Sequence, residues 1–322
     1  MRKAFITGVT GQDGSYLAEL LLDKQYDVVG MDVNLSPEHL QNINHISNKI
    51  TLIEGDIQNR DLLLKSIKTH QPDEIYNFAS ISFVPDSWDS TVTTLGVNAE
   101  GVVNLLEGIR RTNKRIKIFQ ASSSEMFGAP RTHPQNLETP LFPRNPYAAA
   151  KAYAHWLVTC YRSAYNIFAI SGILFNHESP RRPTSFVTRK ITSHVAKIKY
   201  GLCDKLALGN LDTRRDWGFA GDYVNAIWLM MQQEEPEDYI LGTGETHSVR
   251  EFCELAFGYA GLDYQEYVIQ DPRYYREEGE HILVADPILT FRKLHWMPRI
   301  DFQGLVKMMV EADCALLETT IA

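Results

Sequence analysis

The sequence of 322 residues has only four cysteines, and their spacing excludes two common kinds of site. Cys160, Cys203, Cys253 and Cys314 form no CxxC pair and no group with the spacing of metal ligands. The sequence therefore predicts no bound metal and no disulfide framework. It indicates a reducing compartment, and we expect the protein in the cytoplasm.

Long apolar runs and an excess of positive charge are also missing. No run approaches the roughly 20 apolar residues that a membrane-spanning helix requires, and the first residues lack the apolar stretch of a signal peptide. The net charge of -8 gives the chain no general attraction to nucleic acid or to anionic membranes. We expect a soluble protein with neither partner, in which local Arg, Lys and backbone N–H groups bind any phosphate.

What the sequence does contain is a regular alternation of short apolar runs and amphipathic stretches through residues 4–174. This alternation predicts right-handed βαβ units and a doubly wound parallel sheet, an α/β fold of the Rossmann type. Strands are expected at Ala4–Thr7, Val28–Asp32, Thr51–Glu54, Glu74–Phe78, Ile116–Ala121 and Phe168–Leu174, and helices at Ser15–Asp23, Leu62–Ile67, Val97–Ile109 and Tyr147–Tyr165.

The pattern changes after about Asn176, where polar loops lengthen and strands become short. We expect a dinucleotide-binding domain over residues 1–175, to which segments near 211–242 return. A smaller mixed α/β lobe over residues 176–322 is expected to bind the substrate. In this second half, helices are expected at Val187–Lys199, Tyr223–Gln233 and Val249–Ala260, short strands at Leu206–Leu208 and Tyr239–Leu241, and a loop at Asp271–Glu280.

The segment GVTGQDG, residues 8–14, lies between the first expected strand and the first expected helix. Its first glycine allows a tight turn, its second lets backbone N–H groups approach a pyrophosphate, and its third lets the helix pack closely on the strand. Glycines at this spacing also occur by chance, but their position at the start of the chain favours a dinucleotide site. We expect the cofactor to contact Gly8, Gly11, Gln12, Asp13 and Gly14.

Two acidic residues at strand ends indicate which dinucleotide is bound. Asp32 ends the second strand, where a carboxylate accepts hydrogen bonds from the ribose hydroxyls and repels a 2′-phosphate, so we expect NAD rather than NADP. The alternative is an ordinary surface Asp at a strand end. Asp56 and Ile57 follow the next strand and are expected at the adenine ring, although Asp56 could equally cap the next helix.

Tyr147 and Lys151 stand four residues apart, which places them on one face of a helix. A cation beside a phenol stabilises the phenolate, so Tyr147 can accept a proton near neutral pH. Lys151 can also reach the nicotinamide ribose. An inert helix face is the alternative, but the distance from the glycine loop and the preceding Pro146 favour catalysis.

Ser123 and Glu125 lie at the C-terminal end of an expected strand, where ligands of open parallel sheets gather. Ser123 can hydrogen-bond the substrate hydroxyl that is oxidised. Glu125 is more informative, because alcohol oxidation or epimerisation needs no further carboxylate. A carboxylate is needed when a proton is removed beside a ketone and water is eliminated from the next carbon. A capping or ion-paired Glu is the alternative.

With these residues in place, the sequence resembles the GDP-mannose 4,6-dehydratase family of extended short-chain dehydrogenase/reductases over nearly its whole length. The resemblance implies a nucleotide-sugar 4,6-dehydratase that converts a GDP-hexose or GDP-heptose to the 4-keto-6-deoxy sugar. It rests on Gly8–Leu22, Gln120–Gly128, Tyr147–Lys151, Asn176–Ile191 and Leu208–Tyr223.

The resemblance also implies roles for individual residues. Tyr147 and Lys151 take the C4 hydroxyl proton as hydride leaves to NAD, Glu125 moves the C5 proton, the C6 hydroxyl departs as water, and the hydride returns to C6. A solvated basic face is the alternative for the cations of the second half, and His177 is expected to be structural. The implied GDP-sugar contacts are Asn176 at a phosphate, Arg181, Arg182, Lys190 and Arg215 at the diphosphate, Val187 and Asn210 at base and ribose, and Arg276 at the nucleotide.

Several positions depart from the family pattern. Asp32 and Asn34 replace an Arg-rich stretch that in the family binds NADP and helps to build a tetramer. NAD and a homodimer are therefore expected, with a tetramer as the alternative. Ser123 replaces a Thr, and Phe78–Phe83 differ along the wall near the sugar. A related GDP-sugar such as a heptose is thus an alternative to mannose.

Two other classes of protein remain as alternatives. A nucleotide-sugar 4-epimerase or 4-ketoreductase would share the cofactor site, Tyr147 and Lys151. Such epimerases usually carry Thr at the position of Glu125, and such reductases generally lack the string Asn176–Pro180. A non-catalytic NAD sensor or scaffold would tend to lose Tyr147 or Lys151, and both are present.

Overall fold

The computed structural model describes residues 1–275 and 281–321. In this part of the chain the central sheet has seven strands in the order β11-β6-β5-β4-β1-β2-β3, and all neighbours are parallel. The chain starts in the middle and runs outward to β3. It then crosses back to β4, which leaves a switch point between β1 and β4 where ligands bind in such sheets. The predicted doubly wound α/β sheet is confirmed, with strands β1 (Lys3–Thr7), β2 (Asp27–Asp32), β3 (Thr51–Glu54), β4 (Glu74–Asn77), β5 (Lys117–Ser123), β6 (Ala169–Leu174) and β11 (Tyr239–Leu241).

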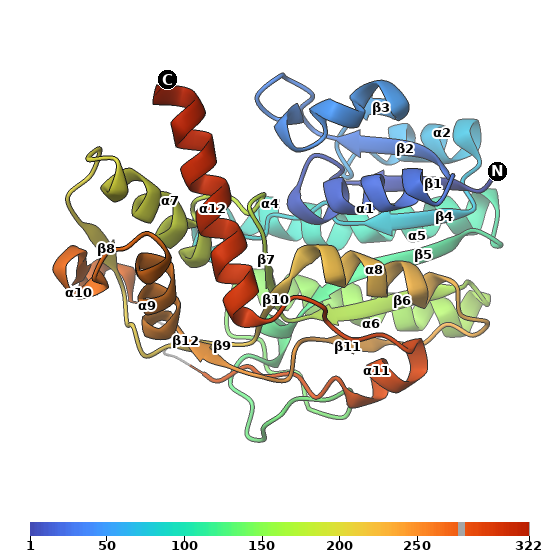
Figure 1. The fold of residues 1–322 in the computed structure, drawn as a ribbon. Coiled ribbons are helices and arrows are strands. Elements are labelled where there is room, and N and C mark those ends of the chain that lie inside the picture. Colours follow the sequence, from blue (N-terminus) through green and yellow to red (C-terminus); the bar gives the residue numbers. More distant parts are fainter. Residues whose placement is uncertain (276–280, 322) are drawn as a thin grey trace.

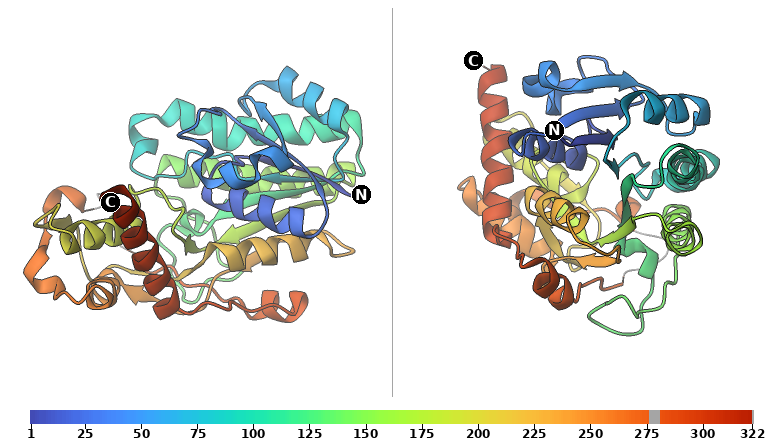
Figure 2. Two further views of the ribbon diagram at one scale, coloured as in Figure 1. Left: turned by 45° about the horizontal axis from the view of Figure 1, so that its top comes forward. Right: turned by 90° about the vertical axis from the view of Figure 1, so that its right-hand side faces the viewer.

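Helices cover both faces of the sheet, as Figure 1 and Figure 2 show. One face carries α1 (Gln12–Asp23) and α8 (Ala220–Met231), and the other carries α2 (Arg60–His70), α5 (Gly101–Thr112) and α6 (Pro146–Tyr165). Apolar side chains are buried on both sides of the strands. The strands therefore read as continuous apolar runs rather than as alternating ones.

The start of α6 is fixed by its local sequence. The Asn145 side chain accepts a hydrogen bond from a backbone N–H of the first turn, and Pro146 follows where its missing N–H leaves no unpaired group. Asn166, in the left-handed region, ends the helix. The first two turns of α6 carry Tyr147 and Lys151, and both side chains are buried.

The smaller lobe, whose helices Figure 1 shows beside the sheet, has its own core. Helices α7 (Val187–Lys199), α9 (Val249–Tyr259) and α12 (Phe302–Ile321) pack around Trp217 and Phe252. In the described residues, three two-stranded pairs accompany them, namely β7 (Asn176–Glu178) with β10 (Trp217–Phe219), β8 (Leu206–Leu208) with β13 (Val268–Gln270), and β9 (Arg214–Arg215) with β12 (His247–Ser248).

The remaining elements are short helices from both halves of the chain. They are α3 (Asp86–Asp89), α4 (Thr91–Leu95), α10 (Tyr264–Tyr267), α11 (Ile288–Leu294) and 3-10 helices at Leu40–Asn42, Asn44–Lys49, Ser124–Phe127 and Pro272–Tyr274.

Some elements differ in extent from the prediction. The helix expected at Val97–Ile109 begins in a π-helical turn over Gly96–Glu100, which follows α4 and continues into α5. Helices α1 and α8 each begin three residues earlier than expected, because apolar periodicity does not reveal where the first turn of a helix begins. The loop expected at Asp271–Glu280 begins with a short 3-10 helix. Among the described residues, no helix combines the length and the apolar character that a membrane crossing requires.

Candidate active site

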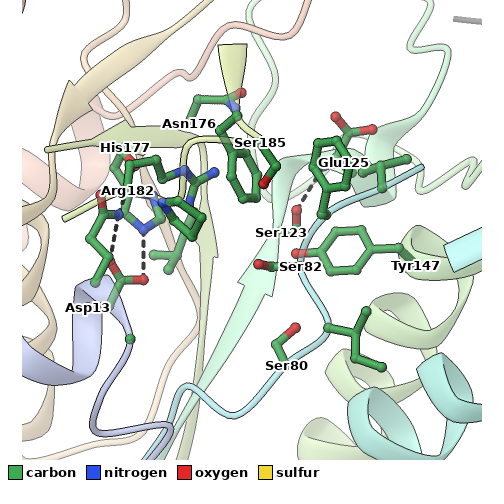
Figure 3. A pocket seen from close by; sticks show the side chains of 18 of the residues that line it. Asp13, Ser80, Ser82, Ser123, Glu125, Tyr147, Asn176, His177, Arg182 and Ser185 are labelled. Carbon is green, nitrogen blue, oxygen red and sulfur yellow. Dashed lines mark hydrogen bonds and ion pairs between the residues drawn. The ribbon is translucent and has the colours of Figure 1, made fainter. Parts of the chain in front are cut away.

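A cavity of about 1050 Å3 lies at the carboxyl ends of the central strands and extends into the smaller lobe. It begins at the glycine loop after β1, passes the ends of β4 and β5 and the first turns of α6, and reaches the segment after β8. Figure 3 shows part of it. The predicted site residues that line this cavity are Gly8, Gly11, Gln12, Asp13, Gly14, Asp32, Asp56, Ile57, Ser123, Glu125, Tyr147, Lys151, Asn176, Arg182, Val187, Lys190, Asn210 and Arg215.

Two predicted site residues are not placed there by the structure. Arg181 is not part of the lining, because its guanidinium turns to α1, where Nη1 donates to Ser15 Oγ at 3.0 Å and Nη2 pairs with Glu19 at 2.5 Å. The ring of Tyr16 lies 4.0 Å from the same guanidinium. This placement does not support the diphosphate role predicted for Arg181, which instead ties the segment after β7 to α1. Arg276 lies outside the described residues.

Gly8 and Gly14 of the glycine loop leave no room for a side chain at their own positions. Gly8 has a φ of +72°, and a Cβ there would lie 2.8 Å from the backbone N of Ala79. A Cβ on Gly14 would lie 2.2 Å from the carbonyl O of Gly8. This close packing brings the N-terminus of α1 to the cavity, where its free N–H groups and the helix dipole favour a phosphate.

Two polar residues of the loop fasten it to β7. Gln12 Nε2 donates to the carbonyl O of His177 at 3.0 Å, and Gln12 Oε1 accepts from Ser179 Oγ at 2.8 Å. Asp13 Oδ2 lies 2.8 Å from His177 Nε2, and Figure 3 shows this pair at one side of the cavity. The cofactor loop and the start of the smaller lobe are thus joined by side chains of both.

Both ring nitrogens of His177 face hydrogen-bond acceptors, an arrangement that favours the protonated imidazolium. Its Nε2 meets the Asp13 carboxylate and its Nδ1 meets the carbonyl O of Phe175 at 2.8 Å, and neither acceptor has a proton to give. Burial acts to lower the pKa of His177, but the charge and the hydrogen bond of Asp13 outweigh it and raise this pKa. The sequence predicted a structural His177, and its place on the cavity lining was missed.

The two acidic residues at strand ends both line the cavity. Asp32 Oδ2 accepts from the backbone N and from Oγ1 of Thr10, at 3.0 and 2.7 Å, so the carboxylate is oriented by the glycine loop. Asp56 accepts from the backbone N of Gln58 at 2.8 Å. The alternative that Asp56 caps the next helix is wrong, because the side chain of Asn59 caps α2.

Tyr147 and Lys151 are 8% and 3% exposed. Burial raises the pKa of Tyr147 to about 12, although the hydrogen bond with Ser123 acts against it. Burial lowers the pKa of Lys151 to about 8. Lys151 Nζ donates to the carbonyl O of Ala121 at 3.0 Å and lies 5.8 Å from the centre of the Tyr147 ring. The pocket therefore favours the neutral phenol.

Glu125 stands in the 3-10 turn directly after β5, beside Ser123 (Figure 3). Its backbone N–H donates to Ser123 Oγ at 3.2 Å. Gly128 ends the turn with a φ of +56°, and a Cβ there would lie 1.8 Å from the carbonyl O of Phe142. The negative charge of Glu125 raises the pKa of Tyr147. Only burial and the hydrogen bond with Ser123 affect this pKa more strongly. A carboxylate, a hydroxyl and a phenol thus share one wall of the cavity.

The far end of the cavity is lined by cationic side chains held in fixed places. Lys190 Nζ lies 3.7 Å from the centre of the Tyr274 ring, and burial lowers the pKa of Lys190. Arg215 is 7% exposed, and its Nη1 donates to two backbone carbonyl groups at 2.8 and 3.2 Å. Arg182 lies nearer the glycine loop, beside His177 and Asp13 (Figure 3), and its guanidinium lies 3.6 Å from the centre of the Phe186 ring. These groups suit an anionic ligand such as a diphosphate.

One wall of the cavity was expected near the sugar, but none of its residues was predicted as an individual contact. Residues 78–85, which follow β4, all line it, and the ring of Phe83 meets that of Phe186 edge-on at 5.4 Å. Ser80 and Ser82 of this wall lie near Tyr147 in Figure 3. The signal was available, because β4 lies beside β1 at the switch point of the sheet.

Comparisons with known proteins agree with this geometry. The sequence matches the family model described as GDP-mannose 4,6 dehydratase over residues 5–309. It is 47% identical to GDP-mannose 4,6 dehydratase 1 of Arabidopsis thaliana, over 97% of this chain and 90% of that protein. It is 44% identical to GDP-mannose 4,6 dehydratase of Homo sapiens, over 98% of this chain and 92% of that protein.

A solved structure supports the fold. The dTDP-glucose 4,6-dehydratase of Bacillus anthracis, in complex with NAD, superposes with a TM-score of 0.85 over 97% of this chain and 96% of that one, at 23% identity. This likeness concerns the fold alone. The family model and the two relatives go further, because they cover nearly the whole chain at high identity. The chain belongs to the GDP-mannose 4,6-dehydratase family.

Proposed function

We propose that this protein is a NAD-dependent dehydratase that converts GDP-mannose, or a closely related GDP-hexose or GDP-heptose, to the 4-keto-6-deoxy sugar. The observation that carries this proposal is the common wall formed by Glu125, Ser123 and Tyr147 beside a glycine loop. Epimerisation at C4 needs the phenol but not the carboxylate, whereas elimination of water needs both.

The residues present fit a bound NAD. The N-terminus of α1 favours its pyrophosphate, the Asp32 carboxylate accepts from ribose hydroxyls and repels a 2′-phosphate, and Asp56 and Ile57 border the adenine. Lys151 would reach the nicotinamide ribose. When bound, NAD supplies the hydride acceptor and the hydride donor of the cycle.

The side chains of the common wall divide the proton transfers between them. Ser123 orients the C4 hydroxyl, and Tyr147 accepts its proton with the help of the Lys151 charge. Oxidation of C4 makes the neighbouring C5–H acidic. Glu125 removes that proton and gives a proton to the C6 hydroxyl, which leaves as water. Such acid–base help contributes roughly 10²–10⁴-fold per group.

The cationic end of the cavity is proposed to bind the GDP moiety. Arg182, Lys190 and Arg215 supply positive charge for the diphosphate, and Asn176 adds a hydrogen bond to a phosphate. Base and ribose lie beside Val187 and Asn210 in this proposal. Residues 1–175, with the returning segments near 211–242, would then bind the dinucleotide, and most of residues 176–322 the sugar nucleotide.

We also propose that the protein is a homodimer in the cytoplasm, with a tetramer as the alternative. Large apolar side chains stand exposed on α3, α4 and α6, and α4 packs against α6. Exposed fractions are 56% for Trp88, 84% for Val92, 54% for Leu95, 53% for Tyr153 and 57% for Trp156. Light scattering during gel filtration tests the dimer, and Tyr153→Glu is expected to release monomers.

Mass spectrometry of products tests the reaction. The enzyme is incubated with NAD and, in turn, with GDP-mannose, a GDP-heptose and CDP-, UDP- and dTDP-linked hexoses. We expect a product that has lost one water from the GDP-mannose or GDP-heptose reaction and from none of the others. A product of unchanged mass would support the 4-epimerase alternative and contradict the proposal.

A further inference from the structure

Asp216 is a fully buried residue between β9 and β10, and its side chain lies outside the cavity lining. The described residues donate four hydrogen bonds to its carboxylate. Oδ1 accepts from the backbone N and from Oγ1 of Thr243, at 2.8 and 2.7 Å. Oδ2 accepts from the backbone N of Gly244 and from that of Ala285, at 3.0 and 3.1 Å. Asp216 therefore joins β10 to the segment after β11 and to the segment before α11.

The surroundings of this carboxylate favour its ionised form. Three of the four donors are backbone N–H groups, which can only donate, so a protonated oxygen would face another donor. Burial raises the pKa of Asp216, and the hydrogen bonds from its partners act against this rise. The packing is also close, because a Cβ on Gly242 would lie 2.7 Å from Oδ2 of Asp216 and 2.3 Å from Cβ of Ala285. The joined segments therefore leave little space for movement around the carboxylate.

One of these segments contacts Arg215, the residue before Asp216, which lines the far end of the cavity. Residues 281–285 run beside it, and Leu283 pairs with Arg215 in a parallel bridge. Nη1 of Arg215 donates to the carbonyl O of His281 at 3.2 Å. Asp216 holds the last residue of the same run through its backbone N. The carboxylate thus fixes the segment that orients the guanidinium.

We propose that Asp216 is a positioning residue, which fixes residues 281–285 and so directs the guanidinium of Arg215 to the diphosphate of the ligand. The inference rests on the proposed function, because the GDP-sugar supplies the diphosphate that Arg215 would meet. A buried carboxylate that accepts backbone hydrogen bonds can also act on stability alone. A positioning role requires in addition that ligand affinity depend on Asp216, and only while Arg215 is present.

Asp222 of α8 provides a matched control for this role. It is 7% exposed, and its Oδ2 accepts from the backbone N of Arg299 and from that of Ile300, at 2.8 and 3.0 Å. Asp222 and both donors lie outside the cavity lining. Asp216→Asn and Asp222→Asn each remove a buried charge that accepts backbone hydrogen bonds. In Asp216→Asn the new NH2 group must also face a backbone N–H, which weakens the hold on residues 281–285.

The two variants should differ in ligand affinity and not only in stability. We expect Asp216→Asn to raise the Kd for GDP, measured by calorimetry, and the KM for GDP-mannose by about tenfold. Its kcat and its Kd for NAD should stay within about threefold, because Arg215 lies at the opposite end of the cavity from the glycine loop. Asp222→Asn is expected to keep all four constants within about twofold, while both variants lower the thermal midpoint. Equal GDP affinities for the two variants would overturn the inference.

A double-mutant cycle tests whether Asp216 acts through the cation. Arg215→Ala alone should raise the Kd for GDP by about 10- to 100-fold, because a charge-assisted hydrogen bond is lost. Asp216→Asn added to Arg215→Ala should then change this Kd by less than about twofold, since there is no longer a guanidinium to misplace. A further tenfold loss in the double variant would show that Asp216 acts on the fold of the site as a whole, and would contradict a positioning role.

If Asp216→Asn does not fold, Thr243→Val takes its place, because it removes one hydrogen bond to the same carboxylate and keeps the side-chain shape. The expected rise in the Kd for GDP is then about threefold, and an unchanged Kd overturns the inference. If the wild-type protein does not bind GDP, the proposed function fails. CDP, UDP and dTDP are then titrated in turn, and the same cycle is measured with the diphosphate that binds. A wild-type protein that binds none of them overturns the inference as well.

Discussion

The two ends of the cavity are built in different ways. The cofactor end consists mainly of backbone, with Gly8 and Gly14 leaving space and with Asp32 and Asp56 at the ends of neighbouring strands. All of these residues come from the first 60 positions of the chain. The opposite end consists of long cationic side chains, each held by a ring or by a partner that is distant in sequence.

The difference predicts how each end can be damaged. A site made of closely packed backbone is sensitive to added atoms, because the neighbouring backbone cannot give way. A site made of charged side chains is sensitive to the loss of charge or of the groups that orient it. Glu125, which lies between the two ends, should affect neither binding step.

The largest effect is expected for Glu125→Gln. The amide cannot take the C5 proton, so turnover to the 4-keto-6-deoxy sugar should fall by roughly 10²–10⁴-fold. Binding of NAD and of GDP, measured by calorimetry, should be unchanged. Glu245→Gln is a control, because that carboxylate is 80% exposed and lies outside the cavity lining. Turnover that survives in Glu125→Gln would contradict the dehydratase assignment.

The stability of the fold should depend on the proton of Lys151. Burial lowers its pKa from 10.5 to about 8, so between these values the unfolded chain binds more protons than the folded one. Stability should therefore rise with pH across this window, by up to about 3 kcal/mol. Urea unfolding at several pH values measures the rise, which should be smaller in Lys151→Met because that variant lacks the contribution of Lys151. Parallel curves for the two proteins would argue against the low pKa.

A single added carbon should damage the cofactor end. In Gly14→Ala the new Cβ would lie 2.2 Å from the carbonyl O of Gly8, and the loop must shift. Such strain costs about 1–3 kcal/mol, so the Kd for NAD should rise about 10- to 100-fold while GDP binding stays within about twofold. Gly258→Ala on α9 is the matched control, because its Cβ would meet no atom within 4 Å. An unchanged NAD affinity in Gly14→Ala would contradict a backbone-built site.

The smallest effect is expected for Arg181, and the comparison with its neighbour Arg182 tests which of the two cations binds the ligand. Arg182→Ala should raise the Kd for GDP by about tenfold. Arg181→Ala should leave this Kd unchanged and lower the free energy of unfolding by less than about 1 kcal/mol, because its pair with Glu19 is partly exposed. If both variants weakened GDP binding equally, the original prediction for Arg181 would be restored.

The cofactor end could be predicted from the sequence because its determinants are local. A strand, a glycine loop and a helix follow one another within 23 residues, and each feature constrains the next. The catalytic pair of Tyr147 and Lys151 was predictable for the same reason, since helical spacing alone puts the two side chains on one face.

The opposite end could not be predicted in the same way. Arg181 and Arg182 are adjacent and of one type, and a turn has no periodicity that tells which of them faces the cavity. The contact between Asp13 and His177 joins residues 164 positions apart. Local patterns encode neither fact, and both depend on how the smaller lobe packs against the sheet.

The pair of Asp13 and His177 also limits how ligands are exchanged. Both side chains are largely buried, so a clamshell separation of lobe and sheet would break their hydrogen bond, at a cost of about 1.5–3 kcal/mol. Sugar nucleotides are therefore expected to pass over the rim, where Ser185 is exposed, while the lobes stay together. The dinucleotide returns to its starting redox state in every cycle. It therefore need not leave the site, and the lobes need not separate to release it.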